Sequence, residues 1–278
     1  MKWFIRFLEF YVNSSIHVAF SVVGLTIVTQ QKFNIFNGFD LPFFVFFATI
    51  TGYNFIKYAG VAKFHHRSLT RSLKVIQVFS FFCFLLMCYF FFQLPLASIQ
   101  LVVIFAGITF FYAIPLVPKI WSPVDENQNL RSISGIKIYV IALVWVGVTV
   151  FLPLSQADMF ISHGVYIEAF QRFLMVMLLM IPFEIRDMKY DSIKLGTIPQ
   201  KIGLKKTKRI ALFLIVVLFA LEFFKDEVSP LEIVIFAVIS ILLGLFIQYS
   251  SKDQSKYYSS FWVEGIPIYW CVLILLLK

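Results

Sequence analysis

The sequence predicts an all-α integral membrane protein with about nine transmembrane helices. These helices belong to a single domain that spans residues 1–278. Three observations support this fold class. Hydrophobic residues make up 60% of the chain and charged residues 14%, whereas charged residues make up about 25% of an ordinary soluble domain. Apolar residues occur in continuous runs near the length of a membrane span, without the alternation of a membrane β-strand. Lysine and arginine concentrate in alternate loops between these runs.

The predicted spans are apolar runs separated by polar residues, proline or glycine. They cover residues 15–29, 41–58, 75–92, 97–114, 136–153, 165–183, 210–224, 231–249 and 261–277. Lys2 and Arg6 precede an earlier apolar run, which is interrupted at Asn13 and has no small-residue cleavage site after it. We therefore expect the N-terminus to be retained as a short helix at the membrane interface.

The positions of the basic residues predict how the spans are oriented. With the N-terminus in the cytoplasm, 20 of the 24 lysines and arginines lie in cytoplasmic segments, and the four outside are Lys32, Arg172, Lys225 and Lys278. The positive-inside rule favours this topology, which places the C-terminus outside. The topology also explains most of the formal net charge of +9, so no nucleic-acid partner is needed. The predicted location is a bacterial inner (plasma) membrane.

Two predicted cytoplasmic loops, residues 60–74 and 184–209, are longer than orientation requires, and we expect them to form the cap of a site. The three cysteines lie elsewhere, within apolar runs and without metal-ligand spacing. We interpret Cys83, Cys88 and Cys271 as packing residues.

The second loop carries the richest pattern of charges. Glu184, Asp187 and Asp191 share one face if the preceding helix continues through them. Carboxylates beside arginine and lysine at a membrane surface suit a hydrated Mg²⁺ that takes its other oxygens from a diphosphate. The alternative interpretation is a solvated helix end with internal ion pairs.

The stretch from Arg186 to Gly203 has the sequence RDMKYDSIKLGTIPQKIG. It resembles the second aspartate-rich motif of the UbiA-type intramembrane prenyltransferases, RD-x-x-x-D, and the T-L-P-x-x-x-G element that follows it. The stretch from Tyr112 to Lys119, YAIPLVPK, resembles the family's Y-S-x-P-x-x-x-K. Nine helices, with aspartate-rich loops after the second and sixth, are also the family plan. The resemblance therefore covers nearly the whole chain.

This resemblance implies a UbiA-like bundle that transfers an isoprenyl group from a prenyl diphosphate to an aromatic, quinone-type or other lipid acceptor. In the family, Mg²⁺ ions held by two aspartate-rich motifs neutralise the departing diphosphate. Carried over to this sequence, Asp187 and Asp191 match the catalytic metal ligands, and Glu184 is a further candidate ligand. The implied substrate-binding residues are Tyr112, Lys119, Arg186 and Lys201.

The first aspartate-rich motif is where the sequence departs from the family. The family has N-D-x-x-D-x-x-x-D at the cytoplasmic end of the second helix. Alignment on Gly52 and Tyr53 places Lys57 where the first aspartate belongs, with Asn54 nearby. An ammonium group there would bind a diphosphate directly, replacing one cation with another. Asn54 and Lys57 are therefore also predicted to bind substrate.

Two other functions remain open at this point. One is a noncatalytic homologue that binds a prenyl diphosphate, a lipid or a partner protein after losing the first metal cluster. The other is a small transporter, which the lack of a convincing internal repeat disfavours. Glu264, near the start of the last span, is either a functional intramembrane acid or a side chain that reaches to the interface.

Overall fold

A computed structural model describes residues 2–35, 38–64, 71–113, 135–159, 162–189, 196–225 and 228–278 of the protein. The secondary structure in these ranges is helical. The α-helices are α1 (Lys2–Asn13), α2 (Ile16–Lys32), α3 (Asp40–Phe64), α4 (Arg71–Phe91), α5 (Leu96–Ala113), α6 (Ile136–Val146), α7 (Leu152–Gln156), α8 (His163–Asp187), α9 (Ile198–Ile202), α10 (Leu204–Ala220), α11 (Pro230–Tyr249) and α12 (Ile266–Leu277). Three short segments have another pitch, namely the π-helices η3 (Gly147–Phe151) and η6 (Tyr258–Val263) and the 3₁₀-helix η5 (Leu221–Phe224).

Each predicted span coincides with a helix or a continuous helical run. The fifth span is α6, η3 and α7 in succession, the seventh is α10 with η5, and the ninth is η6 with α12. Six helical runs in the described part of the chain are long and apolar enough to cross a membrane, or seven if the bent pair α1 and α2 forms one span. The all-α membrane class is confirmed, while the count of nine spans stays a prediction.

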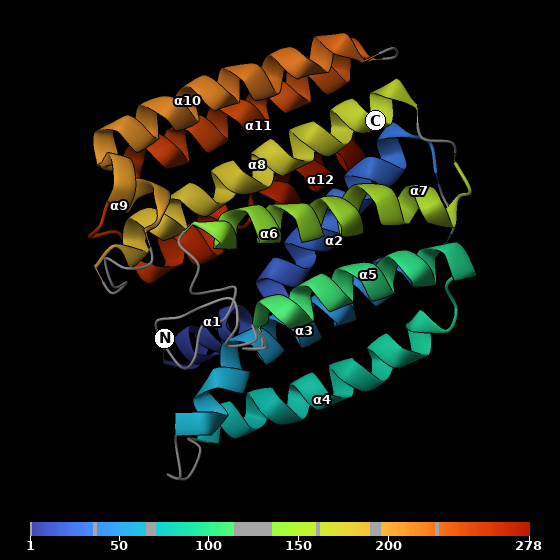
Figure 1. Ribbon diagram of the computed structural model, residues 1–278, viewed down its shortest axis with the longest axis vertical. Coiled ribbons are helices and arrows are strands. Elements are labelled where there is room, and N and C mark those ends of the chain that lie inside the picture. Colours follow the sequence, from blue (N-terminus) through green and yellow to red (C-terminus); the bar gives the residue numbers. More distant parts are fainter. Residues whose placement is uncertain are drawn as a thin grey trace, which may run out of the picture.

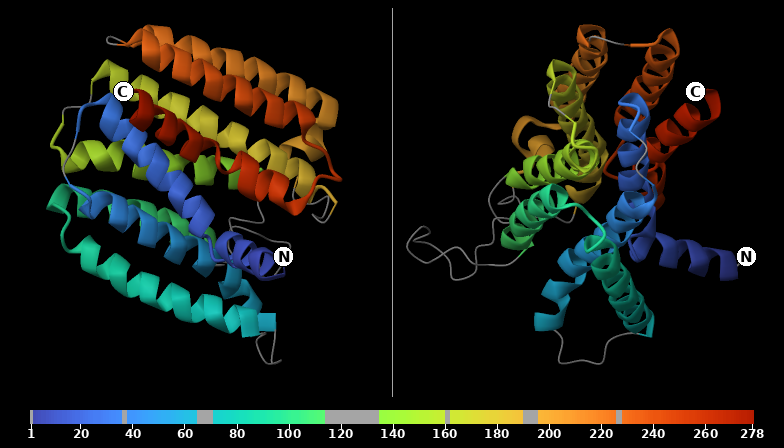
Figure 2. Two further views of the ribbon diagram at one scale, coloured as in Figure 1. Left: turned by 180° about the vertical axis from the view of Figure 1, so that it is seen from behind. Right: turned by 90° about the vertical axis from the view of Figure 1, so that its right-hand side faces the viewer.

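The helices form a bundle with distinct ends (Figure 1). α2 runs through its middle and packs against α3, α12 and η3. α1 and α9 lie at one end, and the end of α10 and the start of α11 lie at the other with the C-terminus. We call the first the basic end, because Lys57, Arg186 and Lys201 belong to it. α1 is bent by 56° from α2 and projects from the bundle (Figure 2).

The helices at the basic end are longer than the apolar runs that predict them. α3 continues to Phe64, α8 continues to Asp187, and α10 begins at Leu204. Lysine, arginine and glutamate are good helix formers, so a helix does not stop where its sequence becomes polar. Much of the two predicted loops is therefore helix, although residues 65–70 and 190–195 lie outside the described ranges.

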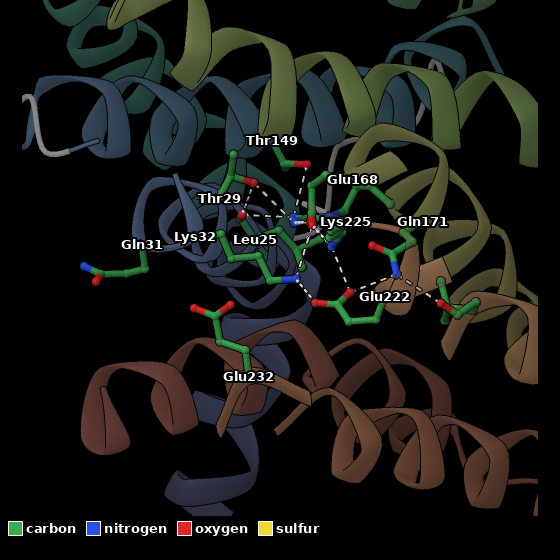
Figure 3. Close-up of polar contacts among 12 residues, drawn as sticks. Leu25, Thr29, Gln31, Lys32, Thr149, Glu168, Gln171, Glu222, Lys225 and Glu232 are labelled. Carbon is green, nitrogen blue, oxygen red and sulfur yellow. Dashed lines mark hydrogen bonds and ion pairs between the residues drawn. The ribbon is translucent and has the colours of Figure 1, made fainter. Parts of the chain in front are cut away.

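A buried ionic network connects several helices at the opposite end of the bundle (Figure 3). Glu168 on α8 accepts contacts from Arg172 at 2.7 Å, Lys225 at 2.6 Å and Lys32 at 3.2 Å. Glu222 on η5 pairs with the same two lysines, at 3.0 Å for Lys32 and 2.8 Å for Lys225. All five side chains are at most 9% exposed. The network therefore ties α2, α8 and η5 together inside the bundle.

Arg172 extends this network towards the centre of the bundle. Its Nη1 donates to the carbonyl oxygen of Leu25 at 2.9 Å, and its Nη2 donates to Thr29 Oγ1 at 3.2 Å. The indole ring of Trp270 lies 5.3 Å from the guanidinium carbon. α8 is thus held at a fixed height against α2 and α12, which in turn sets the position of its far end.

Fusion of a topology reporter tests the orientation of the bundle. A reporter fused after Lys205 and one fused at the C-terminus should localise to opposite sides, with the Lys205 fusion in the cytoplasm, because of the distribution of basic residues. Reporters on the same side would contradict the predicted topology.

Substitution of Arg172 tests the buried network. Arg172→Met should lower the free energy of unfolding by about 3–5 kcal/mol, because it leaves Glu168 with one cation fewer in a dry environment. The readout is thermal denaturation of the purified protein in detergent. Glu9→Gln is the control, because Glu9 pairs with Lys256 at 2.8 Å on the surface and its loss should cost at most about 1 kcal/mol. Equal stability of the two variants would contradict a structural role for the network.

Candidate functional site

The last turn of α8 carries the charged residues of the second motif. α8 ends at Asp187, so it places Glu184 and Asp187 one turn apart but does not continue through the position of Asp191, as a shared face of all three carboxylates would require. Arg186 Nε donates to Asp187 Oδ1 at 2.8 Å, and both side chains keep 23% of their surface exposed. The guanidinium carbon of Arg186 also lies 5.3 Å from the ring of Phe183. These two residues form an accessible ion pair at the basic end.

Glu184 has a different environment from Asp187. It is 3% exposed, and its Oε2 accepts the backbone N–H of Ile198 at 3.2 Å. Ile198 is the first residue of α9, whose leading N–H groups lack partners within the helix. One oxygen of this predicted metal ligand therefore fastens α9 to the end of α8.

The element after the second motif is a short helix. At the start of α9 the backbone N–H of Thr197 donates to Gln200 Oε1 at 3.0 Å, and Gly203 ends the helix with φ of 82°, a conformation that favours glycine. Lys201 lies on α9 and is exposed, with its Nζ 4.0 Å from the position a Cβ would take at Gly135. The element thus presents a lysine at the start of α6.

Asn54, a predicted substrate-binding residue, serves to pack helices. Its Nδ2 donates to the carbonyl oxygen of Ser14 at 3.0 Å and to Ser80 Oγ at 2.7 Å, and its Oδ1 accepts from Ser15 Oγ at 2.8 Å. The side chain is 3% exposed. The amide joins α3 to α4 and to the bend between α1 and α2, and these bonds use both of its N–H groups.

Lys57 lies one helical turn beyond Asn54, where its side chain stays exposed. Its Nζ donates to Ser15 Oγ at 2.8 Å. Ser15 has φ of 65° at the bend between α1 and α2, so the hydroxyl points to α3 from an unusual backbone conformation. Ser15 therefore links the Asn54 amide to the Lys57 ammonium.

An aromatic group lies next to these charges. Trp145 Nε1 on α6 donates to the hydroxyl oxygen of Tyr53 on α3 at 3.0 Å. Tyr53 also interacts electrostatically with Tyr112, a predicted site residue that is 4% exposed at the end of α5. Tyr53, which was not among the predicted site residues, thus links Tyr112 on α5 with Trp145 on α6.

Glu264 is a charged residue at this end whose neighbours could not be predicted from the sequence. It lies just before α12, and it interacts electrostatically with Lys57 on α3 and Arg186 on α8. Its backbone carbonyl oxygen accepts a hydrogen bond from Ser21 Oγ on α2. An acidic residue within an apolar span was the available signal, but only the packing of α12 against α2 shows which cations it faces.

The described residues suit a magnesium ion at one of the two expected positions. Mg²⁺ takes one or two protein carboxylates and completes its shell with water and substrate phosphates, and the partly exposed Asp187 fits that need. The end of α3 does not fit, because the ammonium of Lys57 stands where a carboxylate is required. Within the described ranges, no three histidine, cysteine or acidic side chains come close enough to hold a metal. Asp191 and Lys119 lie outside those ranges, so their predicted roles stay predictions.

Neither a family model nor a curated protein matches the sequence. Solved structures are nevertheless similar over nearly the whole chain. A UbiA homologue from Aeropyrum pernix K1 has a TM-score of 0.64 at 16% identity, covering 94% of this chain and 97% of that one. A digeranylgeranylglyceryl phosphate synthase has a TM-score of 0.55 at 20% identity, with 100% of both chains covered. A UbiA homologue from Archaeoglobus fulgidus, bound to GPP and Mg²⁺, has a TM-score of 0.54 at 14% identity, covering 96% and 98%.

These similarities establish the fold. The chain is an integral membrane protein with the helical architecture of the UbiA homologues. The UbiA-like fold that the sequence resemblance implied is therefore confirmed.

Proposed function

We propose that this chain, which has the UbiA fold, is a prenyltransferase-like membrane protein. It transfers an isoprenyl group from a prenyl diphosphate to a lipid-soluble acceptor, of aromatic or quinone type. The observation that carries this proposal is the meeting of Lys57, Arg186 and Glu264 at one end of the bundle, beside the accessible Asp187. The A. fulgidus homologue, bound to GPP and Mg²⁺, supports prenyl diphosphate as the ligand class.

Each charged residue has a role that follows from its position. Arg186 on α8 and Lys57 on α3 are cations. Both keep N–H groups that could donate hydrogen bonds to phosphate oxygens. Asp187 would hold Mg²⁺, which supplies charge neutralisation of the diphosphate when it is bound. Lys201, exposed on α9, would contact the outer phosphate oxygens. Ser15 accepts a hydrogen bond from Lys57 and donates one to Asn54, and these contacts fix the position of the Lys57 ammonium group.

The transfer itself breaks the allylic C–O bond, and the electron pair leaves with the diphosphate. The carbocation is then captured by an electron-rich carbon of the acceptor, which gives up a proton. Cations around the diphosphate lower the barrier, because negative charge develops there in the transition state. The aromatic faces of Tyr53 and Trp145, next to the charged groups, would stabilise the cationic carbon. The basic end faces the cytoplasm of a bacterial plasma membrane in this proposal.

A second function, binding without catalysis, is favoured by one observation. Lys57 occupies the position of a metal-binding aspartate, so the chain lacks that carboxylate for a first metal cluster. A protein of this kind would bind the prenyl diphosphate, or another lipid, and release it unchanged. Product formation separates the two functions.

Incubation of the purified protein with labelled prenyl diphosphates and a membrane extract tests the proposed activity. A prenylated product should form in the presence of Mg²⁺. Asp187→Asn should lower the rate at least about a hundredfold, which corresponds to a few kcal/mol of lost transition-state stabilisation.

Asp253→Asn is the matched control for this variant. Asp253 lies at the same end of the bundle, where Lys189 donates to it and lowers the pKa of its carboxyl group. It faces solvent, so its substitution should leave the rate unchanged. Binding of prenyl diphosphate without any product would favour the noncatalytic function, and equal rates for both variants would remove Asp187 from the site.

A further inference from the structure

α10 lies at the edge of the bundle, next to α11, and it begins at the basic end (Figure 1). Its buried residues recur every three or four positions, which marks the face that packs inwards. They are Thr207, Ala211, Ile215 and Leu218. The other side of the helix carries an exposed stripe with the same spacing. This α10 stripe consists of Lys206, Arg209, Ile210, Phe213 and Val216.

The apolar part of the α10 stripe faces the hydrocarbon of the membrane. Phe213 and Val216 are 66% and 65% exposed, and both lie within the seventh predicted span. In a membrane protein, a patch of large exposed apolar side chains contacts lipid acyl chains. Towards the basic end the same stripe changes to Arg209 and Lys206. Its apolar and cationic parts thus follow the order in which a phospholipid presents its acyl chains and its headgroup.

The first turns of α10 lie at the height of the membrane interface. Lys208 Nζ donates to the carbonyl oxygen of Gln248 at 2.7 Å, which sets the start of α10 beside the last turn of α11. Tyr249, the last residue of α11, is exposed there. Tyrosine is enriched at the membrane–water interface, where its ring sits among the headgroups. Lys206 and Arg209 are therefore at headgroup height.

The cations of the α10 stripe have no counter-charge within the described part of the chain. Lys256, at the same end of the bundle, pairs with Glu9 at 2.8 Å. Among the described residues, by contrast, Lys206 and Arg209 make neither an ion pair nor a hydrogen bond, and the same holds for the exposed Lys205 beside them. Cations in the first turn also oppose the positive end of the helix dipole, so they do not stabilise α10. An anion from outside the chain is the counter-charge that these side chains can take.

We propose that the α10 stripe binds an anionic phospholipid of the leaflet at the basic end. The headgroup contacts Lys206 and Arg209, and the acyl chains lie along Phe213 and Val216. Basic side chains near a membrane surface attract anionic lipids, whereas a zwitterionic phospholipid offers the same chains without net charge. The inference does not depend on the proposed function, because the stripe lies on the outer side of α10 and α8 packs against its inner side.

The test uses the full-length protein in detergent, mixed with equal amounts of phosphatidylglycerol and phosphatidylcholine that have the same acyl chains. Native mass spectrometry counts the lipids that stay bound. The unmodified protein should retain phosphatidylglycerol in preference to phosphatidylcholine. The double variant Lys206→Gln, Arg209→Gln should lower this preference at least about tenfold, because two attractive charges are gone.

Two further double variants make the test specific to the α10 stripe. Lys256→Gln with Lys278→Gln removes the same number of positive charges, but each of these lysines pairs with a carboxylate. Lys206→Arg with Arg209→Lys exchanges the two side chains and keeps both charges. Both double variants should retain the preference of the unmodified protein for phosphatidylglycerol.

Three results would overturn the inference. Equal retention of the two lipids by the unmodified protein would mean that the basic residues of α10 serve only to orient the chain. An unchanged preference in the Lys206, Arg209 double glutamine variant would place the lipid elsewhere. An equal loss of preference in the Lys256, Lys278 variant would assign the effect to net charge instead of the stripe.

A fluorescence measurement tests the same surface if the double glutamine variant fails to fold. Phe213→Trp adds a tryptophan to the apolar part of the stripe and leaves both cations in place. The added fluorescence should be quenched more by phosphatidylglycerol with brominated acyl chains than by phosphatidylcholine with the same chains. Equal quenching by the two lipids overturns the inference.

Discussion

The ionic network of Lys32, Glu168, Arg172, Glu222 and Lys225 joins α2, α8 and η5 inside the bundle. A charge inside a membrane protein is tolerated only when it is paired, because the surrounding medium cannot solvate it. The pairing therefore fixes how α8 sits against α2 and α12. The rest of the structure depends on this constraint, because the far end of α8 carries Arg186 and Asp187.

This network and one further ion pair account for the four basic residues that depart from the charge asymmetry of the chain. Lys32, Arg172 and Lys225 pair with Glu168 or Glu222, and Lys278 pairs with Glu232 at 2.7 Å. Each of the four is thus neutralised by a carboxylate at the same end of the bundle. Pairing lets these four residues lie at that end of the bundle, and the other 20 lysines and arginines, in the predicted cytoplasmic segments, set the orientation.

The basic end uses charge in a different way. There the cations keep accessible surface and their counter-charges are close but incompletely engaged, as with Glu264 and the two cations it faces. Full pairing stabilises a fold, whereas incomplete pairing leaves groups that a ligand can satisfy. The polar contacts of Asn54, Ser15 and Glu184 belong to the first kind, since they hold α1, α3 and α9 in place around the open groups. This division is what makes the basic end suitable for a phosphorylated ligand.

The sequence by itself determined the membrane class, the approximate positions of the helices and the placement of a charged motif at the end of α8. These follow from local patterns, since an apolar run of span length has few alternatives to a helix in a bilayer. Even Lys57 at the end of α3 was visible as a departure from a family pattern. The similarity of the fold to a UbiA homologue confirms the fold that these local patterns predicted.

The tertiary structure alone decided which charges meet. Glu264 is 207 positions after Lys57 in the chain, and no local pattern relates the two. Asn54 reads as a candidate ligand-binding amide, yet contacts from the bend of α1 and from α4 occupy its hydrogen-bonding groups. Glu168 and Arg172 are one helical turn apart, but their partners Lys32, Glu222 and Lys225 come from other elements. The physical reason is that the pairing of charges depends on the rotation and height of each helix in the bundle, which packing between distant segments sets.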